Sequence, residues 1–384
     1  KAFEYARKYA PAGCKLFYND YNEYNTAKMN YIVSDILKPL IAAGTIDGMG
    51  MQSHISMSTP TIEQYKKAMQ TYSDLGLEIQ VTELDVSQKS NAVADQLELA
   101  QRYQDEILQE IPEVDAILGT NSYDAIAEAV KNVLGGSHYE NFKTLEGIPN
   151  VSAKRSLTTG GHYAHLKIAE GCNKHCTYCI IPKIRGEYRS IPIEELVASA
   201  KDLAAQGVKE LILVAQETTL YGIDLYGEKS LYRLLDELNK IDGIYWIRIL
   251  YCYPEEIDDK LIASIKRNEK VCHYLDLPIQ HADDVILKRM GRRTSQADLR
   301  NIVTKLRTEI PDIALRTTLI CGFPGETEKE HESLMYFINE MEFDRLGAFT
   351  YSPEEDTPAA TFDNQVDEEQ KSVWQREVME LQEE

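Results

Sequence analysis

The most informative stretch of this sequence runs from Ala169 to Pro182 and reads A-E-G-C-N-K-H-C-T-Y-C-I-I-P. Three of its residues, Cys172, Cys176 and Cys179, stand at C-x3-C-x2-C spacing directly after an apolar run. Iron–sulfur clusters are held by cysteine thiolates, and three thiolates on so short a loop can bind one side of a compact cluster. Because no fourth cysteine is near, a tetranuclear cluster bound here keeps one iron open to another ligand, as a catalytic zinc keeps one position open.

A zinc site is the alternative for the same cysteines, with Cys252, Cys272 or Cys321 as the fourth ligand. Cysteine-rich zinc sites usually consist of paired C-x2-C units, and this sequence has no second pair. The spacing therefore favours a cluster and leaves zinc as the second interpretation.

The cysteine motif, with Tyr178 as the aromatic residue before its last cysteine, resembles the signature of the radical S-adenosylmethionine enzymes. The resemblance implies a [4Fe–4S] cluster on Cys172, Cys176 and Cys179 whose open iron chelates the amino and carboxylate groups of S-adenosylmethionine. It also implies an electron donor such as flavodoxin or ferredoxin. The electron splits the sulfonium into methionine and a 5′-deoxyadenosyl radical.

Composition and charge exclude several classes of function. The net charge of −21 argues against a broad contact with nucleic acid, so we expect no DNA partner. No apolar run approaches the length of a membrane span, so we expect no membrane partner. The seven cysteines show no regular pairing pattern, which favours metal binding in a reducing compartment and predicts a cytoplasmic protein. The chain opens at Lys1 inside a helical pattern, and we expect it to be a fragment.

Residues 162–352 alternate regularly between apolar strands and amphipathic helices. The predicted strands are Tyr163–Ala169, Glu210–Val214, Trp246–Tyr251, Tyr274–Leu277, Ala314–Cys321 and Leu346–Tyr351. The predicted helices are Ile193–Gln206, Leu231–Lys240, Glu255–Lys266, Gln296–Glu309 and Glu328–Glu340. Near-continuous apolar strands in six β/α repeats predict an α/β fold with a parallel sheet buried on both faces. This agrees with the six-stranded partial (β/α)6 barrel of the radical S-adenosylmethionine family, and we assign the core to residues 161–352.

Tyr178 of the cysteine motif and polar residues of these strands and their carboxyl ends are the candidates for binding the cofactor. Gln216 and Glu217 follow the second strand, and we expect the carboxylate of Glu217 to hold the amino group of S-adenosylmethionine; a helix-start acid is the alternative. Arg316, in the fifth strand, can reach the cofactor carboxylate or ribose, or it can form a structural ion pair. Gly322, after that strand, permits a close backbone approach to the cofactor.

Gln280 and His281 follow the fourth strand and are predicted to contact substrate or support the core. Together with the run V-I-L-K-R-M-G-R they resemble the RimO-like methylthiotransferases, which act on an aspartate of a small-subunit ribosomal protein. The resemblance covers about residues 101–384 and implies a ribosomal protein as partner. The relatives that modify tRNA usually have Ser after that Gln, where this chain has His281, so a tRNA methylthiotransferase is only the alternative.

Residues 1–90 contain three strings, F-Y-N-D-Y-N, G-M-G-M-Q-S-H and V-T-E-L-D-V, that resemble strands of the family 10 glycoside hydrolases, the xylanases. By this resemblance Glu83 holds the position of the nucleophile, and Asn19, Gln52 and His54 bind or support the sugar. A retaining glycosidase needs two carboxylates about 5 Å apart, and the strand with the acid/base Glu is not present. We therefore expect an incomplete (β/α)8 barrel fragment, with endo-xylanase activity only as an alternative.

The remaining segments are expected to be remnants. Residues 91–160 are predicted to contain a junction helix, Val93–Gln109, and the tail of a methylthiotransferase amino-terminal domain. No cysteine lies between Cys14 and Cys172, so we expect the auxiliary cluster of that family to be absent and methylthiolation to be impaired. Residues 353–384 are predicted to form an acidic, solvent-facing helix from Glu368, with no counterpart of the family's TRAM barrel. The whole chain thus looks like a fusion of two unrelated sequences.

Overall fold

The computed structural model describes residues 2–11, 13–56, 60–82, 85–87, 114–148, 157, 161–354 and 356–383. The chain divides into two compact units, Lys1–Thr144 and Leu145–Glu384, called here the first unit and the second unit. The domain boundaries suggested by the sequence, at residues 90, 160 and 352, stay a prediction. In the described part of the chain, no helix is both long enough and apolar enough to cross a membrane.

The first unit contains a small parallel sheet. Its strands are β1 (Phe17–Asp20), β2 (Gly48–Met51) and β4 (Glu78–Val81), in the order β1-β2-β4, and β3 (His54–Ser56) pairs in parallel with β5 (Asp85–Ser87). Its helical elements are α1 (Ala2–Tyr9), α2 (Thr26–Tyr31), the π-helical η1 (Ile32–Leu37), α3 (Lys38–Ala42) and α4 (Ile62–Ser73). Met49 and Tyr72 are fully buried in its core. Parallel strands joined by helices fit an incomplete βα barrel.

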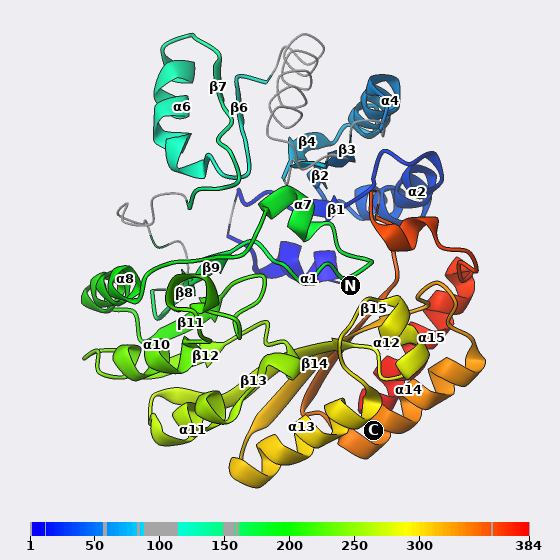
Figure 1. Cartoon of the computed structure of the whole chain (residues 1–384). Helices are drawn as coiled ribbons and strands as arrows, with labels where there is room; N and C mark the ends of the chain where they lie inside the picture. The colour runs from blue at the N-terminus through cyan, green and yellow to red at the C-terminus, as the bar shows by residue number, and fades with distance from the viewer. Residues whose placement is uncertain are drawn as a thin grey trace. The chain divides into compact units, whose positions relative to one another are not determined.

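A separate βαβ element completes the described part of the first unit (Figure 1). Strand β6 (Ala116–Leu118) pairs in parallel with β7 (Tyr139–Asn141), and η2 (Tyr123–Ala125) and α6 (Ile126–Leu134) connect them. This element falls in the segment that we predicted to be the tail of a methylthiotransferase amino-terminal domain. The predicted helix Val93–Gln109 lies outside the described residues.

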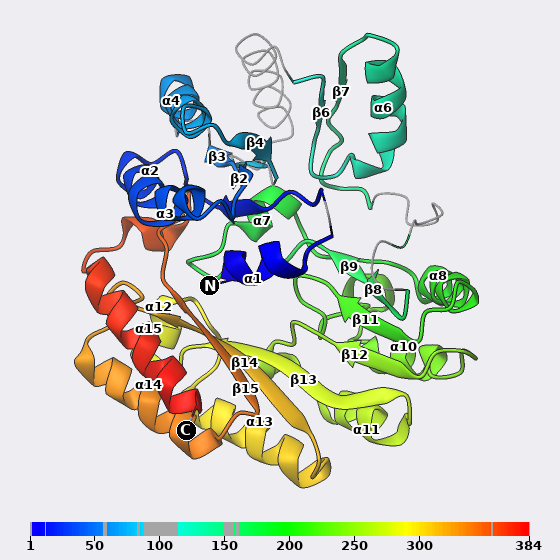
Figure 2. The same ribbon diagram turned by 180° about the vertical axis from the view of Figure 1, so that it is seen from behind.

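The second unit contains the six-stranded parallel sheet that the sequence predicted. Its strands are β8 (Tyr163–Lys167), β11 (Glu210–Val214), β12 (Trp246–Ile249), β13 (Val271–Gln280), β14 (Ala314–Cys321) and β15 (Arg345–Thr350). Their order is β15-β14-β13-β12-β11-β8, so strands that follow one another in the chain are also neighbours in the sheet. This order, with helices between the strands, is that of a (β/α)6 partial barrel (Figures 1 and 2).

Helices cover the outer side of the sheet. The longer ones are α8 (Ile193–Ala205), α10 (Leu231–Leu238), α11 (Asp259–Arg267), α13 (Gln296–Glu309), α14 (Glu328–Met341) and α15 (Glu368–Glu383). The shorter elements are α7 (Ile181–Arg185), α9 (Ile223–Tyr226), η3 (Pro254–Glu256), α12 (Asp284–Arg289), η4 (Pro358–Thr361) and the antiparallel pair β9 (Ala169–Glu170) and β10 (Arg189–Ser190). Capping boxes begin α13 at Ser295 and α14 at Thr327, where the cap side chain accepts from a backbone N–H that has no partner inside the helix.

The two faces of the sheet differ, which corrects the expectation that both are buried. Along β14 every second residue is fully buried, and Leu315 and Leu319 belong to the main core. The residues between them, among them Arg316 and Thr318, are half-buried and face the other side. A partial barrel leaves its inner face open enough to hold polar side chains, so this face can form a binding site.

The carboxyl-terminal helix α15 begins at Glu368, as predicted, but it is not simply solvent-facing. Trp374 and Val378 are buried in the main core, and Lys371 is 1% exposed. The two apolar residues stand four positions apart, so they lie on one face of the helix. This face packs on the sheet and the acidic residues occupy the rest of the surface.

Candidate functional site

A pocket of about 210 Å³ lies in the second unit, where the cysteine loop meets the carboxyl ends of the strands. All three cysteines of the motif line it, together with Tyr178. Among the polar side chains in its lining, Gln216 follows β11, Asp276 and Gln280 lie in β13, and Thr318 lies in β14. Six segments of the chain, at residues 172–182, 216, 251–253, 276–280, 292 and 318, therefore supply one site, as is usual for the carboxyl face of βα barrels.

Backbone contacts fix the cysteine loop. Gly171 has a φ of 77°, and a Cβ at this position would overlap the carbonyl oxygens of residues 186 and 187. The N–H of Cys172 donates to the carbonyl of Gly186 at 3.2 Å, and the N–H of Thr177 donates to that of Met290 at 2.9 Å. The loop is thus tied both to the segment before β10 and to the end of α12. Only a residue without a side chain fits where the loop begins.

The arrangement of the cysteines distinguishes between the two metal interpretations. No group of three or more His, Cys, Asp or Glu side chains in the described ranges is placed to hold one metal ion. The three thiols nevertheless share the lining of one pocket. A zinc ion needs its ligands converging on a single point, whereas a cluster presents a separate iron to each thiolate. Three thiols in the lining of one pocket are a donor set that fits a cluster with one open iron.

Of the two neighbours after β11, Gln216 and not Glu217 lines the pocket. The amide nitrogen of Gln216 donates to Oε1 of Glu170 at 3.3 Å. Glu217 is fully buried, and its carboxylate accepts from the backbone N–H of Thr219 at 2.8 Å and from the Thr219 hydroxyl. Burial raises the pKa of Glu217 to about 7. A role for Glu217 on the cofactor amino group stays a prediction.

Arg316 forms the ion pair that the sequence analysis allowed for. Its Nη1 donates to Oδ1 of Asp276 at 2.5 Å, and the other carboxylate oxygen of Asp276 accepts from the N–H of Tyr251 at 3.2 Å. Asp276 lines the pocket and is 2% exposed. We did not predict this residue from the sequence, although an acid in the middle of the apolar strand β13 was a visible signal.

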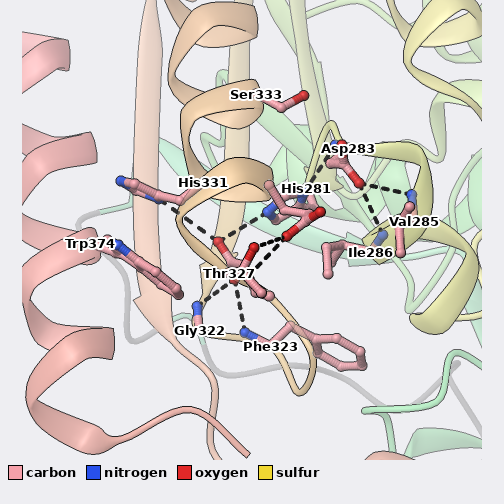
Figure 3. Close-up of polar contacts among 12 residues, drawn as sticks. His281, Asp283, Val285, Ile286, Gly322, Phe323, Thr327, His331, Ser333 and Trp374 are labelled. Carbon is pink, nitrogen blue, oxygen red and sulfur yellow. Dashed lines mark hydrogen bonds and ion pairs between the residues drawn. The ribbon is translucent and has the colours of Figure 1, made fainter. Parts of the chain in front are cut away.

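Gly322 and His281, both labelled in Figure 3, contact the same buried carboxylate. Oε2 of Glu326 accepts from the N–H groups of Gly322 at 2.7 Å and Phe323 at 3.0 Å, and its Oε1 lies 3.2 Å from Nε2 of His281. Burial opposes ionisation, but hydrogen bonds and the nearby imidazoles of His281 and His331 lower the pKa of Glu326 to about 2. His281 is fully buried, which fits support of the core. Gln280, its neighbour, lines the pocket.

The glycosidase-like residues are described only in part. The amide oxygen of Asn19, in β1, accepts from the hydroxyl of Thr82 at 2.7 Å, and Gln52 follows β2, where its N–H donates to the carbonyl of Asp20 at 2.9 Å. His54 lies in β3, but its side chain and the whole of Glu83 are outside the described residues. Sequence analysis missed Glu23, which is fully buried and accepts from the backbone of Ser53 at 3.3 Å.

Two family models match this chain in separate regions. Residues 166–338 match the radical SAM superfamily, and residues 1–125 match glycosyl hydrolase family 10. The second unit therefore contains a radical SAM domain. The cofactors implied by the cysteine motif, a [4Fe–4S] cluster and S-adenosylmethionine, are those of this superfamily. The first unit contains a fragment of the glycosidase family, and its match extends beyond residue 90.

Curated relatives narrow the class of the second unit. The ribosomal protein uS12 methylthiotransferase RimO of Lachnoclostridium phytofermentans is 63% identical over 284 residues, which are 74% of this chain and 64% of that protein. The RimO of Acetivibrio thermocellus is 51% identical over 293 residues, 74% of this chain and 65% of that protein. The radical SAM part of this chain is thus of the RimO type. The chain spans less than two thirds of the length of these relatives.

A solved structure with a similar arrangement is the radical S-adenosylmethionine methyltransferase TsrM from Kitasatospora setae. It is 14% identical, covers 86% of this chain and 69% of its own, and superposes with a TM-score of 0.49. The family assignment rests on the superfamily match and on the RimO relatives.

Proposed function

We propose that Cys172, Cys176 and Cys179 bind a [4Fe–4S] cluster and that the second unit forms a radical from S-adenosylmethionine on it. The observation that carries this proposal is the shared pocket, which is lined by the three thiols and by polar side chains from β13, β14 and the turn after β11. The pocket provides both hydrogen-bond donors and hydrogen-bond acceptors, which the amino and carboxylate groups of an amino-acid moiety require. When bound, the cluster supplies the electron that cleaves the sulfonium.

We assign supporting roles to the remaining predicted residues. Tyr178 packs edge-to-face on Phe323, with ring centroids 6.4 Å apart, and so positions the cysteine loop against the glycine turn after β14. Gln216 and Gln280 offer amide groups to the cofactor or substrate from the pocket wall. Arg316 acts by holding Asp276 in place, and Glu217 and Gly322 shape the strand ends beside the pocket.

The substrate is proposed from the relatives, which are named as methylthiotransferases of ribosomal protein uS12. We propose that the parent activity inserts a methylthio group at an aspartate of that protein, with flavodoxin or ferredoxin as electron donor, in the cytoplasm. The impairment expected from the lack of auxiliary cysteines stays a prediction. Quantifying methylthiolated uS12 by mass spectrometry tests it, and a yield equal to that of a full-length relative would contradict it.

The radical step is tested by anaerobic cluster reconstitution followed by dithionite and S-adenosylmethionine, with 5′-deoxyadenosine quantified. The wild-type chain is expected to form 5′-deoxyadenosine, and Cys176→Ala is expected to form none. Cys272→Ser is the control, because Cys272 is half-buried and outside the pocket. If the wild type instead bound zinc without iron or sulfide, and Cys272→Ser lost that zinc, the zinc interpretation would hold.

Hydrolysis of xylan is the weaker alternative for the first unit. Its family match supports a common origin with the xylanases, and Asn19 and Gln52 lie at strand ends as in an active face. A second carboxylate partner for Glu83 was not found in the sequence. A reducing-sugar assay on xylan is expected to give no product above buffer.

A further inference from the structure

Tyr253 contacts one of the three motif cysteines. It follows β12 in the string Tyr251-Cys252-Tyr253-Pro254, is 9% exposed and lines the pocket. Its hydroxyl oxygen lies 2.5 Å from Sγ of Cys176, within hydrogen-bonding distance. A cysteine bound to iron is a thiolate without a proton, so in the loaded site the phenol is the only group of this pair that can donate. The backbone N–H of Tyr253 donates to the Thr219 hydroxyl at 3.2 Å, which fixes the tyrosine on its strand end.

Two cations lie against the ring of the same tyrosine. The guanidinium carbon of Arg292 is 3.9 Å from the ring centroid, and the ammonium of Lys174 is 4.6 Å from it. Lys174 is paired with Glu256, so its charge is largely compensated. The side chain of Arg292 is fully buried, and its nearest carboxylate, Glu255, is 3.9 Å away. Nη2 of Arg292 donates to the Pro278 carbonyl at 3.0 Å, whereas its Nε and Nη1 have no hydrogen-bond partner among the described residues.

A buried guanidinium with two unused donors is costly unless a negative charge compensates it. The thiolates and cluster that the proposed function puts in this pocket are such a charge. A cation on the face of a phenol draws electron density from the ring, and a low local dielectric strengthens the hydrogen bond that the phenol then donates. Arg292 therefore acts on Cys176 both through space and through Tyr253.

We propose that Tyr253, supported by Arg292, raises the reduction potential of the cluster held by Cys176. This inference rests on the proposed function and assigns Tyr253 and Arg292 as positioning residues. Cluster potentials depend on net charge, on hydrogen bonds to the sulfurs and on solvent exposure. One electron enters from an external one-electron donor, no bond to Tyr253 breaks, and its proton remains on the phenol oxygen. The added negative charge strengthens the hydrogen bond and the attraction to Arg292, so both stabilise the reduced form.

The test is an anaerobic redox titration of the reconstituted chain, followed by electron paramagnetic resonance. Tyr253→Phe keeps the ring and removes only the hydroxyl. We expect it to make reduction about tenfold less favourable, a shift of about 59 mV to more negative potential for a one-electron couple. Tyr245→Phe is the control, because Tyr245 is exposed and does not line the pocket, and it is expected to keep the wild-type potential. Arg292→Gln is expected to shift the potential in the same direction as Tyr253→Phe, and Arg292→Lys to stay closer to wild type.

Iron and sulfide content is measured for every variant, so a change in potential is separated from a loss of cluster. A fully loaded Tyr253→Phe with the wild-type potential overturns the inference and leaves the proposed function intact. A wild-type chain that binds no iron–sulfur cluster overturns both. If Arg292→Gln does not fold, Tyr253→Phe alone decides the outcome, since it changes one oxygen atom.

Discussion

Glu326 shows how a single residue can determine the acid stability of the second unit. Its folded pKa of about 2 lies below the ordinary value of 4.5, because His281, His331 and two backbone N–H groups favour the carboxylate. A lowered folded pKa contributes stability above pH 4.5, and this contribution is lost as the pH falls from 4.5 toward 2. The shift corresponds to about 3 kcal/mol at neutral pH.

Glu326→Gln is therefore expected to lower the free energy of unfolding by about 3 kcal/mol at pH 7. Between pH 7 and pH 3 this free energy should change less in the variant than in the wild type. Urea unfolding at pH 7 and pH 3 measures this. Both tryptophans of the chain, Trp246 and Trp374, lie in the second unit, so tryptophan fluorescence reports on that unit. Glu340→Gln, which removes a surface pair with Arg300, is the control and is expected to change little. An unchanged acid slope in Glu326→Gln would contradict the assignment.

The same residues show what sequence can predict at this scale. That the three cysteines and Gln280 line one pocket could be anticipated, because spacing and strand ends are local properties of the chain. The pairing of Arg316 with Asp276 could not be chosen over a contact with the cofactor, because the two residues are 40 positions apart and belong to neighbouring strands. Which of Gln216 and Glu217 faces the pocket depends on the turn after β11, which the sequence does not specify.

Element α15 anchors the glycine turn after β14. Gly322 has a φ of 75°, and a Cβ there would overlap the side chain of Lys371 on α15. Lys371 is held by a hydrogen bond from its Nζ to the carbonyl of Tyr351 at 3.0 Å. Helix α15 therefore packs directly over the turn that we assign beside the cofactor.

Gly322→Ala is expected to cost about 2–4 kcal/mol, the sum of left-handed strain and of overlap in a packed region. Gly227→Ala is the matched control, because it has a φ of 73° with nothing within 4 Å of the new Cβ, so it shows strain alone. In a Lys371→Ala background the extra cost of Gly322→Ala is expected to shrink toward that of the control. Urea unfolding of the four variants measures the coupling. A coupling near zero would show that α15 does not support the turn.

Prediction from sequence was best for elements with clear boundaries. Strands β11 and β14 and helix α13 begin and end at the predicted residues. Strand β13 is longer than predicted. Cys272 and His273 interrupt the apolar pattern near its start, and its pairing with β14 shifts register between Leu277 and Gln280 near its end. Burial of α15 was missed because acids dominate its composition, although Trp374 and Val378 at i and i+4 were the available signal.

For the whole molecule, binding of the cluster is expected to stabilise the second unit and leave the first unchanged. A ligand that binds only the folded state raises stability by mass action, and the three cysteines that bind it all lie between residues 145 and 384. The reconstituted chain is therefore expected to unfold at higher urea than the iron-free chain when followed by tryptophan fluorescence. A chelator should reverse the increase, and Cys176→Ala should not show it. The first unit contains no tryptophan, so its unfolding is followed by proteolysis within residues 1–82, at a rate expected to be the same with and without iron. An equal midpoint for loaded and iron-free chains would mean that the pocket binds the cluster no better than the unfolded chain does, and would contradict the proposed site.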